Sequence, residues 1–280
     1  MKRLLIILLL IAAIAHHTTA VTHRALVIGL GKQADTSWGK IHGDLDVFYV
    51  VQMLNTTGFT DVRTLKNEQA TKQGIVRAFI DLAGSCKKGD IVYVHYSGHG
   101  QLITDIDGDE ILRTGSQHAQ WDESWIPYDA YMTYCKEDRG EKHLTDDEVA
   151  FYMQAIRNKI GSKGRLTVAI DACHSGDATC GEEEECVRGV DLKFNIPRTT
   201  SDVQATAAQP ENWQTISACK PYQLSTEMKT MNIGKLTYAI CTMGRRTFSM
   251  TNAELQKTLN DFMELNKGRL PQNPVVSGTR

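Results

Sequence analysis

A cysteine and a histidine each stand just beyond a short apolar segment. The segment at 91–96 leads into Gly-His-Gly, with His99 at the centre, and the segment at 165–171 leads into Cys173. Such runs of Val, Ile and Tyr are typical of strands buried in a sheet. If these strands are neighbours in a parallel sheet, their carboxyl ends place the thiol and the imidazole at one edge. The pattern therefore predicts a cysteine nucleophile activated by histidine.

The residue types suggest separate chemical roles. The Cys173 thiolate would attack a carbonyl, His99 would protonate the leaving amine, and the N–H groups of Gly100 and Cys173 would bind the oxyanion. Two other histidines compete for the role of the base. His95 lies inside the predicted strand, and His174, as the next residue after the cysteine, points to the opposite face of an extended chain. The competing interpretation of Cys173 is a buried structural thiol, which its polar flanking residues disfavour.

Strands and helices are expected to alternate around these residues. The expected strands lie at 24–29, 61–65, 91–96, 165–171 and 213–217, with a last edge strand after 270. The expected helices lie at 45–54, 71–83, 146–160, 236–243 and 253–265. This alternation predicts an α/β fold with a mostly parallel central sheet and helices on both faces. The stretches 102–142 and 177–209 lack periodicity and are expected to be long loops, which are usually functional or mobile.

The ends and the composition of the chain indicate an exported globular protein. Lys2 and Arg3 precede an apolar run at 4–15, and small residues follow, so residues 1–20 are expected to be a secretory signal peptide. A membrane anchor is the alternative, but the run is short for a bilayer. Residues 21–280 are then one domain. The formal net charge of −2 gives no electrostatic reason to expect nucleic acid or an anionic membrane as partner.

The chain has seven cysteines, an odd number. Export would allow some of them to pair, and internal pairing would leave at least one thiol, for which Cys173 is the candidate. Cys180 and Cys186 could close a small loop, although all seven could equally be reduced. The sequence has no CxxC pair, which argues against a structural zinc site.

The sequences around both candidate residues carry a family resemblance. HYSGHG at 95–100 and DACHSG at 171–176 resemble the two catalytic signatures of metacaspases and their bacterial relatives, which are cysteine peptidases. Further similar stretches are GDLDV at 43–47, ISACKPYQLSTE at 216–227 and GKLTYA at 234–239. The resemblance covers most of the chain after residue 24. It implies a caspase-like three-layer sandwich and a catalytic dyad of His99 and Cys173.

The resemblance also implies a pocket for a basic side chain. Asp171 stands where the caspase signature has glutamine. In metacaspases this acidic residue and an aspartate of the N-terminal segment line the pocket, which corresponds here to Asp171 and Asp46, with Ser97 as a further lining residue. Asp44 is the alternative to Asp46, which could instead be an exposed helix carboxylate. Two carboxylates suit a guanidinium or ammonium group, so cleavage is predicted after Arg or Lys.

Many metacaspases need calcium, and the positions that match their ion site are Asp122, Asp146 and Asp147. Cys180 occupies the position of the family's fourth ligand, which leaves Asp177 or Glu182 as substitutes. The alternative role for Asp146 and Asp147 is favourable charge at a helix N-terminus.

A separate motif, DIDGD at 105–109, resembles the opening of an EF-hand loop. Glu110 replaces the required glycine and Ser116 stands at the twelfth position, so a complete EF-hand is not expected.

The stretch at 177–209 is also a candidate processing segment. It offers Arg188, Lys193 and Arg198 to a peptidase specific for basic residues, and some relatives cut themselves in this way. An ordinary surface loop is the alternative.

The sequence therefore predicts an exported, monomeric cysteine endopeptidase that is made as a zymogen. It would act on proteins or peptides with a basic residue before the cleaved bond, and would need no cofactor for the chemistry, with calcium as a stimulator. One rival is a clostripain- or gingipain-like peptidase with the same dyad and basic preference. The other is a calcium-responsive binding module in which the dyad is idle.

Overall fold

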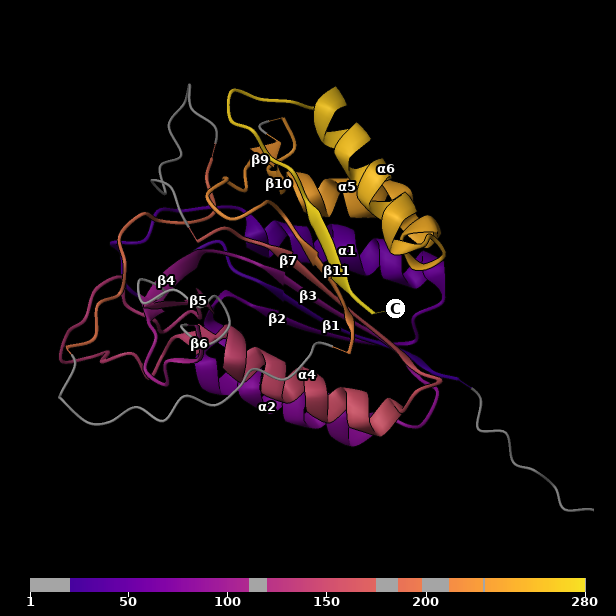
Figure 1. The fold of residues 1–280 in the computed structure, drawn as a ribbon, viewed down its shortest axis with the longest axis horizontal. Coiled ribbons are helices and arrows are strands. Elements are labelled where there is room, and N and C mark those ends of the chain that lie inside the picture. The colour runs from indigo at the N-terminus through magenta and orange to yellow at the C-terminus, as the bar shows by residue number, and fades with distance from the viewer. Residues whose placement is uncertain (1–20, 111–119, 175–185, 198–211, 229, 280) are drawn as a thin grey trace, which may run out of the picture.

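The central sheet brings the strands that precede the two candidate residues together at its middle (Figure 1). The computed structural model describes residues 21–110, 120–174, 186–197, 212–228 and 230–279. Within them the main sheet has six strands, in the order β11 (Val275–Gly278), β8 (Gln214–Ser217), β7 (Arg165–Asp171), β3 (Ile91–Ser97), β1 (His23–Gly29) and β2 (Asp61–Lys66). Neighbouring strands from β8 to β2 are parallel, and the edge strand β11 is antiparallel to β8.

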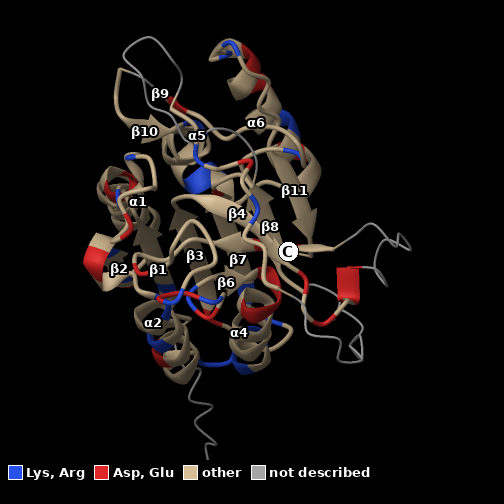
Figure 2. Cartoon of the chain, turned by 90° about the vertical axis from the view of Figure 1, so that its left-hand side faces the viewer, with Lys and Arg blue, Asp and Glu red and all other residues tan. Residues whose placement is uncertain are grey.

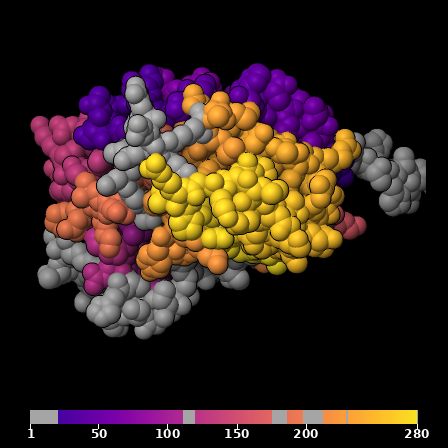
Figure 3. Space-filling model, turned by 90° about the horizontal axis from the view of Figure 1, so that it is seen from above, coloured from indigo at the N-terminus to yellow at the C-terminus, as the bar shows by residue number. Residues whose placement is uncertain are grey.

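Helices cover both faces of this sheet, as Figure 1 shows. One face carries α1 (Gly43–Thr57), α5 (Lys235–Met243) and α6 (Asn252–Leu265), and the other carries α2 (Lys72–Ser85) and α4 (Asp146–Ile160). Seen from above in the space-filling view, the indigo to purple N-terminal residues lie beside the orange and yellow C-terminal residues on one face of the molecule (Figure 3). The predicted three-layer α/β sandwich with a mostly parallel sheet is confirmed.

Alternation along the buried strands divides the core around the main sheet into two clusters, one on each face. Successive side chains of a strand point to opposite faces of its sheet. In β1, Leu26 and Ile28 therefore pack toward α2 and α4, whereas Ala25 and Val27 pack toward α1, α5 and α6. All four are fully buried, which is the pattern expected for a parallel sheet covered on both faces.

The stretch expected to be a loop from 102 to 142 contains strands, which corrects that prediction. A small antiparallel sheet consists of β4 (Gly100–Thr104), β5 (Trp121–Trp125) and β6 (Leu144–Thr145). Hydrophobic alternation did not reveal these strands because they bury polar side chains, including Gln101 and Ser124. The remaining short elements are β9 (Glu227–Met228), β10 (Ile233–Gly234), η1 (Asn67–Gln69) and η2 (Gly244–Phe248).

A capping box fixes the start of α4. The Thr145 hydroxyl accepts a hydrogen bond from the Glu148 N–H, and the Glu148 carboxylate accepts one from the Thr145 N–H. Asp146 and Asp147 consequently lie in the first turn of the helix.

The expected signal peptide at 1–20 lies outside the described residues. None of the helices described is long and apolar enough to cross a membrane. Acidic and basic residues are interspersed over the view in Figure 2.

Candidate active site

His99 and Cys173 follow adjacent strands, as predicted. Strands β3 and β7 pair in parallel, with Ser97 opposite Asp171, so each candidate residue lies two positions beyond a paired residue. Both are almost completely buried, with exposed fractions of 0% for His99 and 2% for Cys173. Cys173 carries a thiol rather than a disulfide.

The surroundings of His99 determine which ring nitrogen can take part in proton transfer. Its Nε2 lies 2.7 Å from the Gly39 carbonyl oxygen, which can only accept, so Nε2 carries the proton. Its Nδ1 is buried and has no hydrogen-bond partner. The Trp38 ring stacks on the imidazole at a centroid distance of 5.2 Å. Burial lowers the pKa of His99 to about 4, so at neutral pH the ring is uncharged and its Nδ1 lone pair can accept a proton.

The predicted pocket residues converge on the side chain of Arg188. Its Nη1 donates to Asp46 Oδ2 at 2.6 Å and to the Ser97 hydroxyl, and lies 3.6 Å from Asp171 Oδ2. Glu227 Oε1 accepts from Nε and Nη2 at 3.1 and 2.9 Å. We call Asp46, Ser97, Asp171 and Glu227 the arginine pocket. The arginine itself is fully buried.

Neighbouring groups hold these carboxylates in place. Asp171 accepts hydrogen bonds from the Ser225 hydroxyl at 2.7 Å and from the N–H and hydroxyl of Thr237 at 2.8 and 2.6 Å. Burial, together with the charge of Asp171, raises the pKa of Asp46 to about 6, although Arg188 opposes the shift. Burial also disfavours ionisation of Glu227, but Arg188 and His42 hold its pKa below the usual value.

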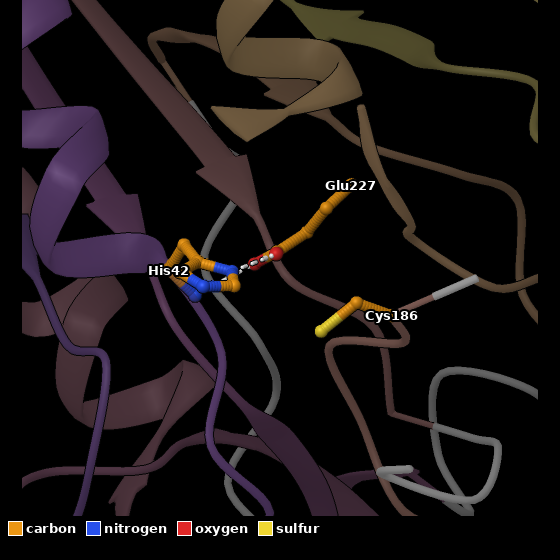
Figure 4. A group of neighbouring side chains, drawn as sticks. All are labelled: His42, Cys186 and Glu227. Atoms are coloured by element: carbon orange, nitrogen blue, oxygen red, sulfur yellow. Dashed lines mark hydrogen bonds and ion pairs between the residues drawn. The ribbon is translucent and has the colours of Figure 1, made fainter. Parts of the chain in front are cut away.

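Glu227 is a pocket residue that the sequence did not single out. Figure 4 shows it pointing toward His42, whose Nδ1 lies 2.6 Å from Glu227 Oε2. The STE sequence at 225–227, inside a stretch that resembles metacaspases, was the available signal. Cys186 lies beside this pair, but it is disulfide-bonded, so the three residues do not offer a thiolate to a metal. Its predicted partner, Cys180, lies outside the described residues.

The backbone around Arg188 is held as an added strand. We call residues 186–197 the docked segment. The Arg188 N–H donates to the Ser225 carbonyl at 2.9 Å, and the Glu227 N–H donates to the Cys186 carbonyl at 3.1 Å. Val187 and Thr226 form an antiparallel bridge between these two hydrogen bonds. An extended peptide that adds to a strand edge in this way is a common mode of peptide recognition.

The Arg188 carbonyl lies where an oxyanion would be stabilised. It accepts hydrogen bonds from the N–H groups of Cys173 and Gly100, at 3.0 and 3.3 Å. The next residue, Gly189, is so close to the thiol that a Cβ built on it would lie 2.7 Å from the Cys173 sulfur. The peptide bond between Arg188 and Gly189 therefore lies beside the thiol, with its oxygen on the two N–H groups expected from the sequence.

The competing residues lie elsewhere. His95 is buried between the Tyr93 hydroxyl at 2.9 Å and the Thr237 hydroxyl at 3.2 Å. His174 faces Glu123, with 3.4 Å between Nδ1 and Oε2. Asp44 accepts a hydrogen bond from the Asn67 amide and has no contact with Arg188 among the interactions described. Of the other processing candidates, Lys193 lies over the Trp121 ring and Arg198 lies outside the described residues.

The three predicted calcium ligands lie together in a larger group of carboxylates. Oxygen atoms of Asp122, Asp146 and Asp147 all lie within 4.8 Å of one another. The group continues into the DIDGD motif, and its members, which we call the acidic cluster, are Asp105, Asp107, Asp109, Asp122, Asp146 and Asp147. The alternative fourth ligands, Asp177 and Glu182, lie outside the described residues.

Two members of the acidic cluster show that it suits a cation. Asp109 and Asp122 are 4% and 6% exposed, and Oδ1 of each has no hydrogen-bond partner. Burial and neighbouring carboxylates raise the pKa of Asp122 to about 8 and that of Asp109 to about 6. Clustered carboxylate oxygens are the ligands that Ca²⁺ prefers. The link between the DIDGD motif and Asp122 could not be seen in the sequence, because it depends on how β4 and β5 pair.

Comparison with known proteins agrees with the geometry. The Caspase domain family model matches residues 22–280. Metacaspase-1A of Aspergillus oryzae is 35% identical over 124 residues, which are 44% of this chain and 25% of that protein. Metacaspase-1B of Neurospora crassa is 36% identical over 119 residues, which are 42% of this chain and 24% of that protein. The aligned region is thus only about a quarter of each relative's length.

Solved structures support the same fold. Caspase-1 from Spodoptera frugiperda superposes with a TM-score of 0.60 and 14% identity, covering 92% of this chain and 87% of that one. A Geobacter sulfurreducens protein gives the same TM-score at 20% identity, covering 92% and 94%. The chain therefore belongs to the Caspase domain family, and within it resembles the metacaspases.

Proposed function

We propose that this protein is a cysteine endopeptidase that cleaves after Arg or Lys, and that its own Arg188–Gly189 bond is a substrate. One observation carries the proposal. A buried arginine side chain fills a pocket of carboxylates while its carbonyl oxygen accepts from two N–H groups beside a thiol. The docked segment thus resembles a bound substrate, which supports synthesis as a zymogen that processes itself.

The chemistry follows from these positions. The Cys173 proton passes to Nδ1 of His99, and the thiolate attacks the Arg188 carbonyl carbon. The N–H groups of Cys173 and Gly100 stabilise the oxyanion that forms. Protonated His99 then gives its proton to the Gly189 nitrogen, the C–N bond breaks, and an acyl-enzyme remains on the sulfur. Water, deprotonated by His99, attacks this thioester, and a carboxylate at Arg188 and the regenerated thiol result.

The charge of the arginine pocket supports a basic preference. Asp46, Asp171 and Glu227 surround the guanidinium, and the planar fork of arginine allows it to contact several of them at once. Lysine can supply the charge but fewer hydrogen bonds, so we expect it to be the weaker substrate. Action as a monomer is part of the same proposal.

We also propose calcium as the stimulator, held by Asp122, Asp146, Asp147 and Asp109. A bound cation would neutralise carboxylates that otherwise repel one another in a buried site. Asp122 lies on β5, which pairs with β4, and β4 begins at Gly100, one of the two expected oxyanion donors. This route connects the acidic cluster to the active site. Export, with residues 1–20 as the signal peptide, remains part of the proposal.

The test compares the purified wild type with Cys173→Ala, each with and without added calcium. We expect the wild type to yield a new N-terminus at Gly189 and to hydrolyse fluorogenic peptides that end in Arg, with little activity on those that end in Asp. The Cys173→Ala variant should stay intact. If the wild type hydrolyses Arg and Lys peptides no faster than Cys173→Ala, the protein is not this peptidase, and the idle binding module becomes the better interpretation.

A further inference from the structure

Beyond the proposed cleaved bond, the docked segment lies along β4, and we call the space that it fills there the groove. Parallel bridges join Gly100 to Gly189 and Ile103 to Phe194. The Phe194 N–H donates to the Leu102 carbonyl at 2.8 Å, and the Thr104 N–H donates to the Phe194 carbonyl at 3.1 Å. The segment therefore lies beside β4 as an added strand, held partly by backbone hydrogen bonds that any sequence could make.

The first position of this groove has no room for a side chain. A Cβ on Gly189 would lie 2.3 Å from the Cys173 carbonyl oxygen and 2.7 Å from its sulfur. The carbonyl belongs to the backbone that also carries an oxyanion donor, so it cannot move aside without disturbing the site. Only glycine fits this conformation.

The second position is an apolar pocket. Val190 is 6% exposed and packs in a cluster with Trp38, Ile126 and Ala130, with Met132 against it. Trp38 also stacks on His99. The residue at this position therefore contacts the same aromatic ring that supports the candidate base.

The sixth position is an aromatic pocket. Phe194 is fully buried, with its ring centroid 4.2 Å from that of His143 and 6.2 Å from that of Tyr134. His143 is fixed in turn by Gln101, whose amide oxygen lies 3.0 Å from His143 Nε2 and whose amide nitrogen donates to the Leu192 carbonyl at 2.7 Å. The side chains between the two pockets, at 191–193, are exposed.

We propose that β4 and these pockets form a leaving-side groove that selects substrates with glycine directly after the cleaved bond, a small apolar residue second and an aromatic residue sixth. The ligand class is an extended peptide of the form Arg-Gly-Val-x-x-x-Phe. This inference rests on the proposed function, because the groove begins at the Arg188–Gly189 bond. Anchors at three positions, with exposed side chains between them, are the arrangement expected of a recognition site rather than of continuous core packing.

Self-cleavage of the full chain tests the groove in place. The variants are Gly189→Ala, Val190→Asp and Phe194→Ala, and the control is Leu192→Ala, whose side chain is apolar but 49% exposed. We expect each of the three to slow the appearance of the Gly189 N-terminus by about tenfold or more, since even one methylene in a pocket changes rates by that factor, and the control to stay within about twofold. Equal rates for all four variants would overturn the groove.

Synthetic peptides keep the result independent of folding. Peptides that cover residues 186–196 with the same substitutions are given to the wild-type enzyme, beside a fluorogenic Arg substrate that has nothing but a dye after the arginine. We expect kcat/KM to fall by about tenfold or more for the peptides that carry Gly189→Ala, Val190→Asp or Phe194→Ala. For the peptide that carries Leu192→Ala, kcat/KM should be unchanged. Cleavage of every peptide at one rate would refute the groove and leave the proposed function intact. Failure to cleave even the dye substrate would refute the proposed function itself.

Discussion

The charge balance of the arginine pocket predicts an effect on thermal stability that can be measured without catalytic turnover. The perturbation is Arg188→Gln in a Cys173→Ala background, so that the chain stays uncut. Arg188 is the cation that contacts Asp46, Asp171 and Glu227, and all three carboxylates are at least 97% buried. Glutamine has a similar length but no charge, so in the variant the three carboxylates face one another without a neutralising cation.

The expected loss follows from the cost of an unpaired buried charge. Removal of one partner from a buried ion pair costs about 3–5 kcal/mol. For a domain of this size, each kcal/mol lowers the melting temperature by about 2–4 °C, so we expect a decrease of about 6–20 °C. The loss should depend on pH. Burial already raises the pKa of Asp46 to about 6 with Arg188 present, and removal of the arginine raises it further. A carboxyl group whose pKa is raised on folding destabilises the folded state above that pKa, so the deficit should shrink as the pH falls from about 8 to about 5.

Thermal unfolding by circular dichroism at several pH values measures both effects. Arg165→Gln in the same background is the matched control, because it removes one exposed arginine from β7. We expect that control to melt within about 2 °C of its parent, since surface substitutions usually change stability by less than about 0.5 kcal/mol. If Arg188→Gln melts with the control, or if its deficit grows as the pH falls, the guanidinium does not neutralise the pocket and the reasoning is wrong.

Two further predictions concern the acidic cluster and the buried His95. Calcium at about one hundred times its dissociation constant should stabilise the Cys173→Ala chain by about 2.7 kcal/mol in a thermal melt. Asp122→Asn should abolish most of this gain, and the exposed control Asp81→Asn should keep it. An equal gain in both variants would exclude the acidic cluster as the calcium site. Burial lowers the pKa of His95 to about 4, so the folded state requires the neutral ring and loses up to about 3 kcal/mol of stability as the pH falls from about 6.5 to 4. In urea titrations, His95→Gln should lose less stability over this pH interval than the parent. An unchanged loss would show that His95 is not its source.

The two candidate dyad residues could be located from the sequence because strand ends are local features. The runs at 91–96 and 165–171 are short, β-branched and flanked by glycine, and parallel pairing then brings His99 and Cys173 to one edge. The pocket residues Asp46 and Asp171 also meet as the resemblance implied. These positions follow from strand order, which alternation and motif spacing constrain strongly.

The rest depends on contacts between distant parts of the chain. Sequence reasoning identified Arg188 as one of three basic residues in a polar stretch, but nothing local distinguishes it from Lys193. Which basic residue fills the pocket depends on where the segment adds to residues 225–227 as a strand. Glu227 was not identified for the same reason, because its role exists only when His42, just before α1, and the docked segment meet around it. The strands β4 and β5 were missed because polar residues fill their inner positions.

The carboxylates of the arginine pocket explain why the docked segment would have to be both a substrate and a structural part. Asp46, Asp171 and Glu227 bring three negative charges into a buried site, and at neutral pH a cation offsets them there without the penalty of an unpaired buried charge. Departure of Arg188 is therefore costly unless water or another basic side chain enters. A substrate arginine restores the same contacts, so exchange between the two is favoured over an empty pocket. Selectivity for basic residues and latency of the uncut chain would then have one physical origin.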